Sequence, residues 1–248
     1  GFGPRAERFA GAGIDWWVCP GTSGWNSLVG RLSNARANAL DAVACAAEFG
    51  ATGMLVTEWG DNGHLQPPTV MLPALTAAAS VAWCRKANED LDLAAALDAW
   101  VLPSSGGGEA LCAAGEAFAG TGVIQPNGSA LHDAVAGGAM GAFGEPTESN
   151  LDDVRATLDE AAATLAGTGF EDPTAGRTLG QAVAAARHGA DRLARRHGLP
   201  AADDLTLRAT LDALVDEQAA CWSLTSRPGG LPDSLARLQA RARADRLP

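Results

Sequence analysis

The stretch Ile14-Asp15-Trp16-Trp17-Val18-Cys19 decides the fold, together with its later counterpart Gly53-Met54-Leu55-Val56-Thr57-Glu58-Trp59. Both stretches are rich in β-branched and aromatic residues, and a polar, glycine-containing loop follows each of them, which predicts two buried strands. Between the strands, apolar residues recur at helical spacing from Ser33 to Gly50, and a second helical stretch spans residues 70–86. Such alternation of strand and helix is typical of a parallel βαβα unit with a right-handed crossover.

The remainder of the chain is predicted to form helices separated by glycine and proline turns. Expected helices span residues 91–100, 109–118, 128–136, 150–166, 178–197, 205–224 and 232–246. We therefore expect an α/β domain over residues 1–88 and an all-α domain over residues 89–248.

The charge balance excludes several classes of function. The chain carries 18 basic and 29 acidic residues, for a formal net charge of −11, and Lys86 is its only lysine. A nucleic-acid-binding protein needs clustered Lys and Arg for counterion release, so nucleic acid is not an expected partner. An anionic membrane surface is disfavoured for the same reason, and no apolar stretch reaches the ~20 residues of a membrane span.

The cysteines favour a reducing compartment. There are five of them, far apart and never in a Cys-x-x-Cys pair, which indicates neither a disulfide framework nor a thiolate zinc site. We therefore expect a cytoplasmic protein.

The loop after the second strand holds the strongest candidate site residues. Side chains alternate along an extended strand, so Thr57, Trp59 and Asp61 are predicted to share one face, with Glu58 on the other. An indole followed two residues later by a carboxylate is suited to sugar binding, because the ring stacks on C–H groups and the carboxylate accepts from hydroxyls. Spacing alone favours the alternative, with Trp59 in the core and Asp61 capping a turn. His64 could donate to a substrate oxygen or be purely structural.

The loop after the first strand offers hydroxyls, an amide and an indole, and its candidate binding residues are Trp25 and Asn26. A serine-hydrolase elbow is rejected, because Gly21-Thr22-Ser23-Gly24 is one residue shorter than Gly-x-Ser-x-Gly. No phosphate-binding glycine motif is present, so no nucleotide cofactor is expected.

No metal is expected either. The other histidines lack partners at helical spacing and are interpreted as surface or core residues. They are His132, His188 and His197.

At these two loops the chain resembles the family 20 glycoside hydrolases, the β-N-acetylhexosaminidases, and in particular a bacterial branch of that family. The resemblance rests on four stretches and runs from about residue 5 to about residue 238. They are Trp17-Val18-Cys19-Pro20-Gly21-Thr22-Ser23-Gly24-Trp25-Asn26-Ser27, Thr57-Glu58-Trp59-Gly60-Asp61-Asn62-Gly63-His64-Leu65-Gln66-Pro67, Gln125-Pro126-Asn127-Gly128-Ser129-Ala130-Leu131 and Arg227-Pro228-Gly229-Gly230-Leu231-Pro232-Asp233-Ser234.

The resemblance implies that residues 1–88 are the last two βα units of a (β/α)8 TIM barrel, followed by an α-helical C-terminal domain. It implies a glycan bearing a terminal N-acetylhexosamine as partner and substrate. Trp59 and Asp61 match the pair that lines the sugar pocket in the wider family, with Trp25 and Asn26 contributed by the preceding strand's loop. His64 is typical of the branch, without a role that carries over.

The catalytic Asp-Glu pair of the family is absent from this sequence. In such enzymes the Glu is the acid/base, and the Asp orients the substrate's own acetamido group, which attacks the anomeric carbon. We expect that pair upstream of Gly1, so that this chain is the C-terminal part of an exo-β-N-acetylhexosaminidase and inactive by itself. The alternatives are a non-catalytic carbohydrate-binding protein and a helical interaction protein. Glu58 stands where the branch more often has Asp, and we expect the longer acid to be tolerated.

Overall fold

The structure is a computed structural model that describes residues 1–137 and 141–244, with side chains up to residue 240. It is mostly helical, with two short strands. In chain order its main elements are α1 (Gly3–Gly11), β1 (Trp17–Val18), α2 (Leu32–Phe49), β2 (Gly53–Met54), α3 (Leu72–Asn88), α4 (Leu93–Ala96), α5 (Gly107–Gly120), α6 (Ala130–Ala136), α7 (Glu148–Gly167), α8 (Pro173–Arg196), α9 (Asp204–Thr225) and α10 (Leu231–Ala244).

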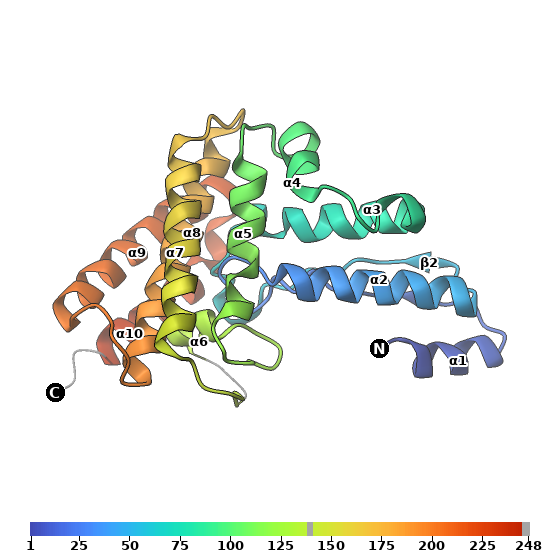
Figure 1. Ribbon diagram of the computed structural model, residues 1–248, viewed down its shortest axis with the longest axis horizontal. Helices are drawn as coiled ribbons and strands as arrows, with labels where there is room; N and C mark the ends of the chain where they lie inside the picture. Colours follow the sequence, from blue (N-terminus) through green and yellow to red (C-terminus); the bar gives the residue numbers. More distant parts are fainter. Residues whose placement is uncertain (138–140, 245–248) are drawn as a thin grey trace.

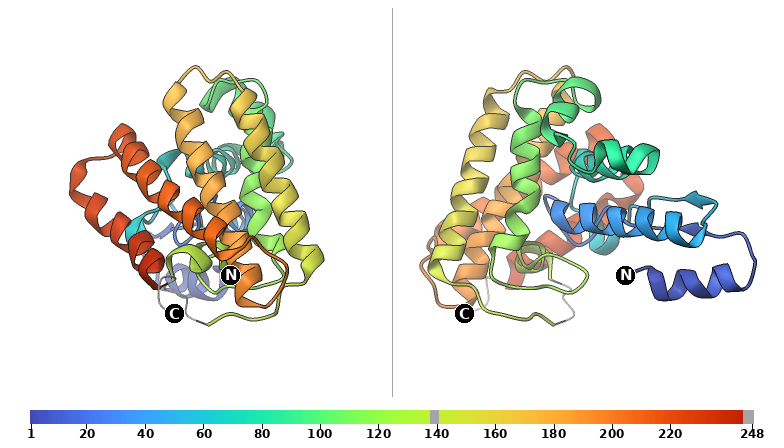
Figure 2. Two further views of the ribbon diagram at one scale, coloured as in Figure 1. Left: turned by 90° about the vertical axis from the view of Figure 1, so that its left-hand side faces the viewer. Right: turned by 45° about the vertical axis from the view of Figure 1, so that its right-hand side comes forward.

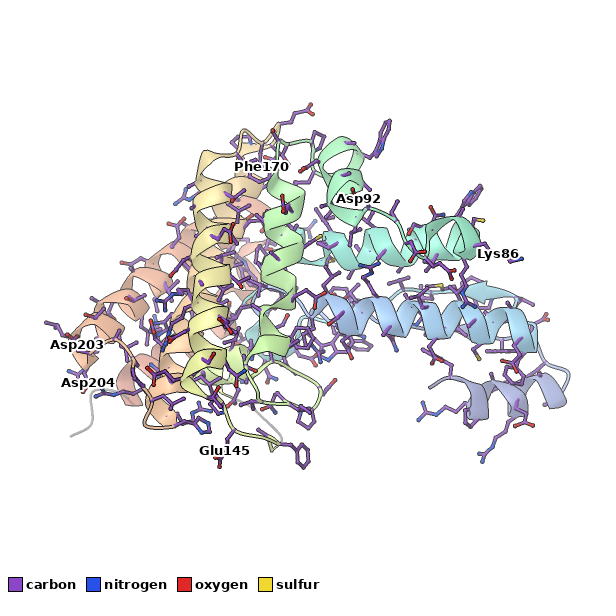
Figure 3. The ribbon with its side chains drawn as sticks, viewed as in Figure 1. Lys86, Asp92, Glu145, Phe170, Asp203 and Asp204 are labelled. Carbon is purple, nitrogen blue, oxygen red and sulfur yellow. The ribbon has the colours of Figure 1, made fainter. Side chains whose placement is uncertain are left out.

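The chain forms a helical bundle with an arm. Helices α5, α7 and α8 stand side by side at the centre, with α9 and α10 on one side and the short α6 at one end (Figure 1). On the other side α2, α3 and the strands project as an arm, and α1 lies against α2 near its outer end (Figure 2). Lys86 lies toward the tip of the arm and Phe170 at one end of the bundle (Figure 3).

The two strands form a parallel pair only two residues long. Trp17 pairs with Gly53 and Val18 with Met54, and an isolated bridge follows between Gly21 and Thr57. Helix α2 makes the crossover between the strands. Its left-handed C-cap, Gly50 with φ +72°, ends the helix where the sequence predicts.

The prediction that residues 1–88 form the last two βα units of a TIM barrel is wrong. Each strand has two residues where the sequence predicts residues 14–19 and 53–59, and among the described residues the sheet has no third strand. Ile14 and Leu55, predicted to be buried on strands, are 53% and 52% exposed. A buried parallel strand needs a neighbour on each edge and a helix on each face. Among the described residues each strand has one strand neighbour, and the helices that pack on the pair are α2 and α3, through Ala39, Ala78 and Val81. The fold is a helical bundle that carries a minimal sheet, not the last two βα units of a TIM barrel.

The bundle has a leucine- and alanine-rich core. Leu111 of α5, Leu158 of α7 and Leu179 of α8 are fully buried and belong to one cluster. Helix α7 begins with a reciprocal capping box between Thr147 and Asn150. The sequence predicts this helix over residues 150–166, two residues short of its observed start.

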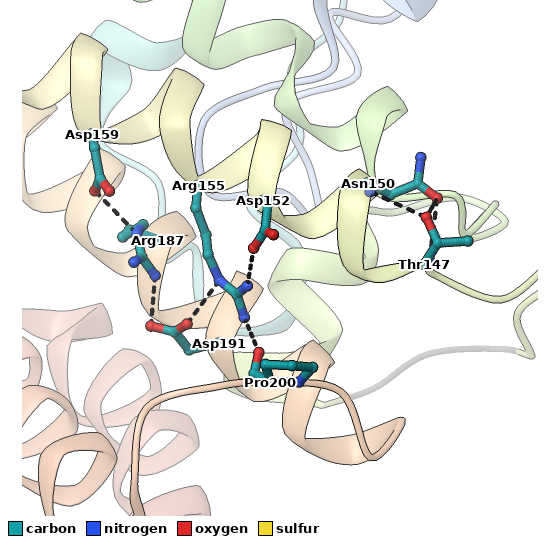
Figure 4. Close-up of polar contacts among 8 residues, drawn as sticks. All are labelled: Thr147, Asn150, Asp152, Arg155, Asp159, Arg187, Asp191 and Pro200. Atoms are coloured by element: carbon teal, nitrogen blue, oxygen red, sulfur yellow. Dashed lines mark hydrogen bonds and ion pairs between the residues drawn. The ribbon is translucent and has the colours of Figure 1, made fainter.

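Charged side chains join α7 to α8 (Figure 4). Arg155 donates to Asp191 over 2.9 Å and to the carbonyl oxygen of Pro200, while Arg187 bridges Asp191 and Asp159. The side chains of Arg155 and Asp191 are only 12% and 16% exposed. In this partly buried setting the network contributes more than an isolated surface pair.

Within the part of the chain that the structure describes, no helix combines the length and the apolar character needed to cross a bilayer.

Candidate functional site

Three segments that are far apart in the sequence meet where the arm joins the bundle. They are the loop after β1, the loop after β2 and a turn at Gln125–Ser129 that precedes α6. The first two are joined through their backbones, since Thr57 N–H donates to the Pro20 carbonyl and Thr22 N–H to the Thr57 carbonyl. The backbone N–H of Ser129 donates to the Asn26 carbonyl over 2.9 Å, which joins the turn to the first loop.

A chain of side-chain amides links the same three segments. Asn62 Nδ2 donates to Asn26 Oδ1 over 2.7 Å, and Asn26 Nδ2 donates to the Asn127 carbonyl over 3.1 Å. Both bonds fix the orientation of an amide, because each side chain uses a defined donor. The Asn127 side chain also accepts the indole N–H of Trp25, with 2.6 Å between Nε1 and Oδ1.

The loops of the site hold residues in the left-handed region of the backbone map. Within the described residues five non-glycine positions have positive φ, and all five lie in these three segments. They are Ser23, Asn26, Asn62, His64 and Asn127, with φ between 48° and 59°. Asparagine tolerates this conformation better than most residues, and such backbone is concentrated at functional sites.

The three segments, together with α6 and Gly137, line an open cavity of about 200 Å³. Its lining is mostly amide, hydroxyl and carboxylate side chains. It is formed by Asn26, Asp61, Asn62, Gln125, Pro126, Asn127, Gly128, Ser129, His132, Asp133 and Gly137. Asn26 and Asp61, predicted as site residues from separate loops, therefore lie at one cavity.

Asp61 begins a short 3-10 turn over Asp61–Gly63 and does not cap it through its side chain. In the portion of the chain with described side chains, its carboxylate has no hydrogen-bond partner. Asp133 differs, since it accepts from Arg196 over 2.6 Å. The carboxylate of Asp61 is thus an acceptor in the cavity that is open to a ligand.

Trp25 is held beside the cavity by contacts on several sides. Besides the bond to Asn127, the guanidinium of Arg31 lies 5.2 Å from the ring centroid, within the range of a cation–π contact. A Cβ on Gly21 would come within 2.5 Å of the ring, so only glycine fits beneath it. The indole is therefore fixed in orientation before any ligand arrives.

Trp59 lies outside the cavity lining. The predicted alternation that paired it with Asp61 does not apply, because β2 ends at Met54 and both residues lie beyond the strand. Trp59 is 58% exposed, so it is not a core residue either.

His64 is also separated from the cavity. Its ring meets Trp222 edge to face at 6.3 Å, and burial lowers its pKa. Its neighbour Gly63, with φ +92°, packs against Ser234 and Arg237 of α10, where a Cβ would lie 3.3 Å from each of them. Trp222 in turn donates its indole N–H to the Arg227 carbonyl over 2.7 Å. The stretch at 227–234 thus supports the loop that carries Asp61.

Glu58 lies in a buried polar cluster next to the first loop. Gln66 Nε2 donates to its carboxylate over 3.4 Å, and a Cβ on Gly24 would come within 2.6 Å of that carboxylate. Burial raises the pKa of Glu58 and lowers that of Arg31 to about 10, although each partly offsets the other's shift. Glu58 Oε2, Arg31 Nη2 and Gln66 Oε1 are buried without a partner among the described atoms. None of these three residues lines the cavity.

Several cavity residues have no role in the sequence-based assignment. Asn62 and Asn127 each precede a glycine, and this Asn-Gly pairing is the signal that marks left-handed turns. His132 lines the cavity from α6 and is 2% exposed. Burial lowers its pKa to about 4, so its imidazole is neutral at neutral pH, and its Nε2 has no partner among the described atoms.

The described residues contain no group of three or more His, Cys, Asp or Glu side chains placed to hold a metal ion. The cavity's acceptors instead suit a ligand that brings its own hydrogen-bond donors. In comparisons with known proteins, the chain matches no protein-family model. A search of curated proteins likewise finds no match.

Proposed function

We propose that the chain binds a terminal N-acetylhexosamine of a glycan in this cavity, as part of a glycoside hydrolase that resembles the exo-β-N-acetylhexosaminidases. The observation that carries the proposal is the placement of Asn26 and Asp61 at one cavity of about 200 Å³. Both belong to the loops on which the sequence resemblance rests. A cytoplasmic location, expected from the cysteines, is part of the same proposal.

The chemistry of the cavity supports a sugar ligand. A pyranose presents several hydroxyl donors, and the Asp61 carboxylate accepts them with charge-assisted bonds. The amides of Asn26 and Asn62 are oriented by their mutual hydrogen bond, so ligand binding costs these side chains little conformational entropy. The indole of Trp25, bonded to the cavity residue Asn127, is proposed to stack on C–H groups of the sugar ring.

The proposed reaction is substrate-assisted hydrolysis with retention. The acetamido oxygen attacks the anomeric carbon as the glycosidic bond breaks, and water then opens the cyclic intermediate. The acid/base carboxyl that protonates the leaving oxygen is not assigned to any residue of this chain. In the proposed enzyme this chain binds and orients the sugar.

A non-catalytic carbohydrate-binding protein is the second candidate. Asp133, the other carboxylate of the cavity, is held in an ion pair with Arg196, so the cavity lacks two free carboxylates for acid/base work.

A helical interaction protein is the third candidate. It is favoured by Trp83 and Trp100, which are 91% and 84% exposed.

Titration calorimetry with N-acetylglucosamine and N-acetylgalactosamine tests the proposal. We expect saturable binding that Asp61→Asn weakens by about tenfold, the effect of losing a hydrogen bond to a charged group. Glu145→Gln removes an exposed carboxylate elsewhere and is the matched control. If neither sugar binds, the proposal is wrong. If binding occurs, turnover of a chromogenic β-N-acetylglucosaminide by the full parent protein separates hydrolase from binding protein.

A further inference from the structure

We propose that the turn Gln125–Ser129 is the second wall of the sugar site and that Asn127 is its positioning residue. The inference rests on the proposed function and deepens it. It assigns part of the binding site to a segment about 100 residues after the first strand loop and about 60 residues after the second.

One residue of the turn holds two residues of the first loop. The side-chain oxygen of Asn127 accepts the indole N–H of Trp25 over 2.6 Å, and its backbone carbonyl accepts the amide of Asn26 over 3.1 Å. The reciprocal bond runs from the Ser129 N–H to the Asn26 carbonyl. Asn127 therefore sets the orientation of both side chains at once.

The backbone of the turn is adapted to this contact. Asn127 and Asn26 both have left-handed φ, 55° and 50°, and they face each other across the contact. A Cβ on Gly128 would lie 3.1 Å from the Asn26 Cβ and 3.3 Å from its carbonyl oxygen. The close approach thus favours glycine at 128 and a residue that tolerates positive φ at 127.

The turn itself is anchored at both ends, so it can act as a wall. Ser129 is buried, and its hydroxyl accepts from the Leu131 N–H at the start of α6. Gln125 is also buried and donates through Nε2 to the Gly141 carbonyl over 3.0 Å. The two strand loops are held to the same bundle, because Leu28, Val29 and Leu65 belong to its core, so the turn and the loops are fixed relative to one another.

The chemistry of the ligand follows from both walls. The strand loops present the Asp61 carboxylate and oriented amides, and the turn adds the amide of Gln125 and the hydroxyl of Ser129. A neutral sugar with hydroxyl donors on two edges fits this arrangement, whereas an anionic sugar would meet the Asp61 charge.

Two variants of Asn127 test its role. Asn127→Gly keeps the left-handed backbone available and removes the side-chain acceptor, whereas Asn127→Asp keeps an acceptor at the same place. The readout is the indole N–H resonance of Trp25 in a nitrogen–proton correlation spectrum, assigned with Trp25→Phe. We expect the resonance to shift and its hydrogen exchange with water to accelerate in Asn127→Gly, and the bonded signal to be restored in Asn127→Asp.

The same variants are then titrated with N-acetylglucosamine. We expect Asn127→Gly to bind about fivefold more weakly, the effect of one neutral hydrogen bond, with Glu145→Gln unchanged. An unaltered Trp25 resonance in Asn127→Gly overturns the positioning role without bearing on the proposed function. If the unmodified chain binds the sugar and Asn127→Gly binds it equally well, the turn is not a wall of the sugar site, and the proposed function stands. If the unmodified chain does not bind the sugar, both the proposed function and the role of the turn in the sugar site are wrong.

Discussion

Acid is expected to destabilise this fold through His132, and a single substitution isolates the effect. His132 lies on α6 with 2% of its surface exposed, and burial lowers its pKa from 6.5 to about 4. In the folded protein the imidazole is neutral, whereas in the unfolded chain it takes up a proton at its ordinary pKa. A folded-state pKa below the unfolded value gives stability that is present above pH 6.5 and lost as the pH falls toward 4.

The magnitude follows from the two pKa values. At pH 5 the unfolded chain gains from protonating His132 while the folded protein hardly does so. The pKa of 6.5 lies 1.5 units above that pH, which corresponds to a loss of about 2 kcal/mol at 1.36 kcal/mol per unit. At pH 4 the loss reaches about 3 kcal/mol. Against a typical unfolding free energy of about 5–15 kcal/mol, this is a large fraction.

Urea denaturation of the parent chain and of His132→Gln at several pH values measures the effect. The substitution changes packing by an amount that does not depend on pH, so the informative quantity is the change in the difference between the two proteins. Other titrating groups, including His64, contribute equally to both and cancel. We expect the difference to move by about 2 kcal/mol in favour of the variant between pH 7 and pH 5. Parallel curves for the two proteins would refute the argument, and exposed His197→Gln is the control.

Three further substitutions test the packing around the site and the bundle. Gly63→Ala should lower the free energy of unfolding by about 2 kcal/mol in urea denaturation, because alanine is strained at φ +92° and its Cβ would crowd α10. Gly229→Ala, with open space around it, should change it by less than ~0.5 kcal/mol, and equal effects would contradict the contact. Burial raises the pKa of Glu58, so its charged form destabilises the fold as the pH rises above about 4.5. The stability of Glu58→Gln relative to the unmodified chain should therefore increase over that pH range. A difference in thermal unfolding that does not change with pH would contradict this. Asp191→Asn should cost about 1–3 kcal/mol, because it weakens two partly buried contacts with arginine. Asp152→Asn, at a side chain 60% exposed, should cost little, and similar midpoints of the two variants in urea would exclude the network as a stabilising element.

The helices could be predicted from the sequence because their signals are local. Apolar residues at helical spacing and the glycine, proline and asparagine turns place helices at residues 150–166 and 205–224, close to the observed α7 and α9. Helix α1 is not predicted, since its nine residues include Gly3, Pro4 and Gly11, which are poor helix formers, and it buries only Ala6. The prediction of a TIM-barrel segment failed because strands depend on non-local contacts. A strand is stabilised by neighbouring strands, and strand-forming residues alone do not show that such neighbours exist.

The site was only partly predictable for a related reason. Asn26 and Asp61 could be selected because their loops follow strand-like stretches, and whether they bind a sugar stays a prediction. The partnership of Asn26 with Asn127 spans 101 residues, and no spacing rule reports it. His64 was selected for its chemistry, yet the conformation of its loop turns it toward Trp222 and away from the cavity.

The left-handed residues of the three loops have a consequence for protein engineering. Each is a position where glycine would relieve backbone strain, so a stability-driven redesign would choose these positions first. Yet Asn26, Asn62 and Asn127 are the side chains that hold the cavity together. Variants selected for heat resistance alone should therefore lose ligand affinity through these positions, whereas stabilising changes in the core of α5, α7 and α8 should leave the cavity intact.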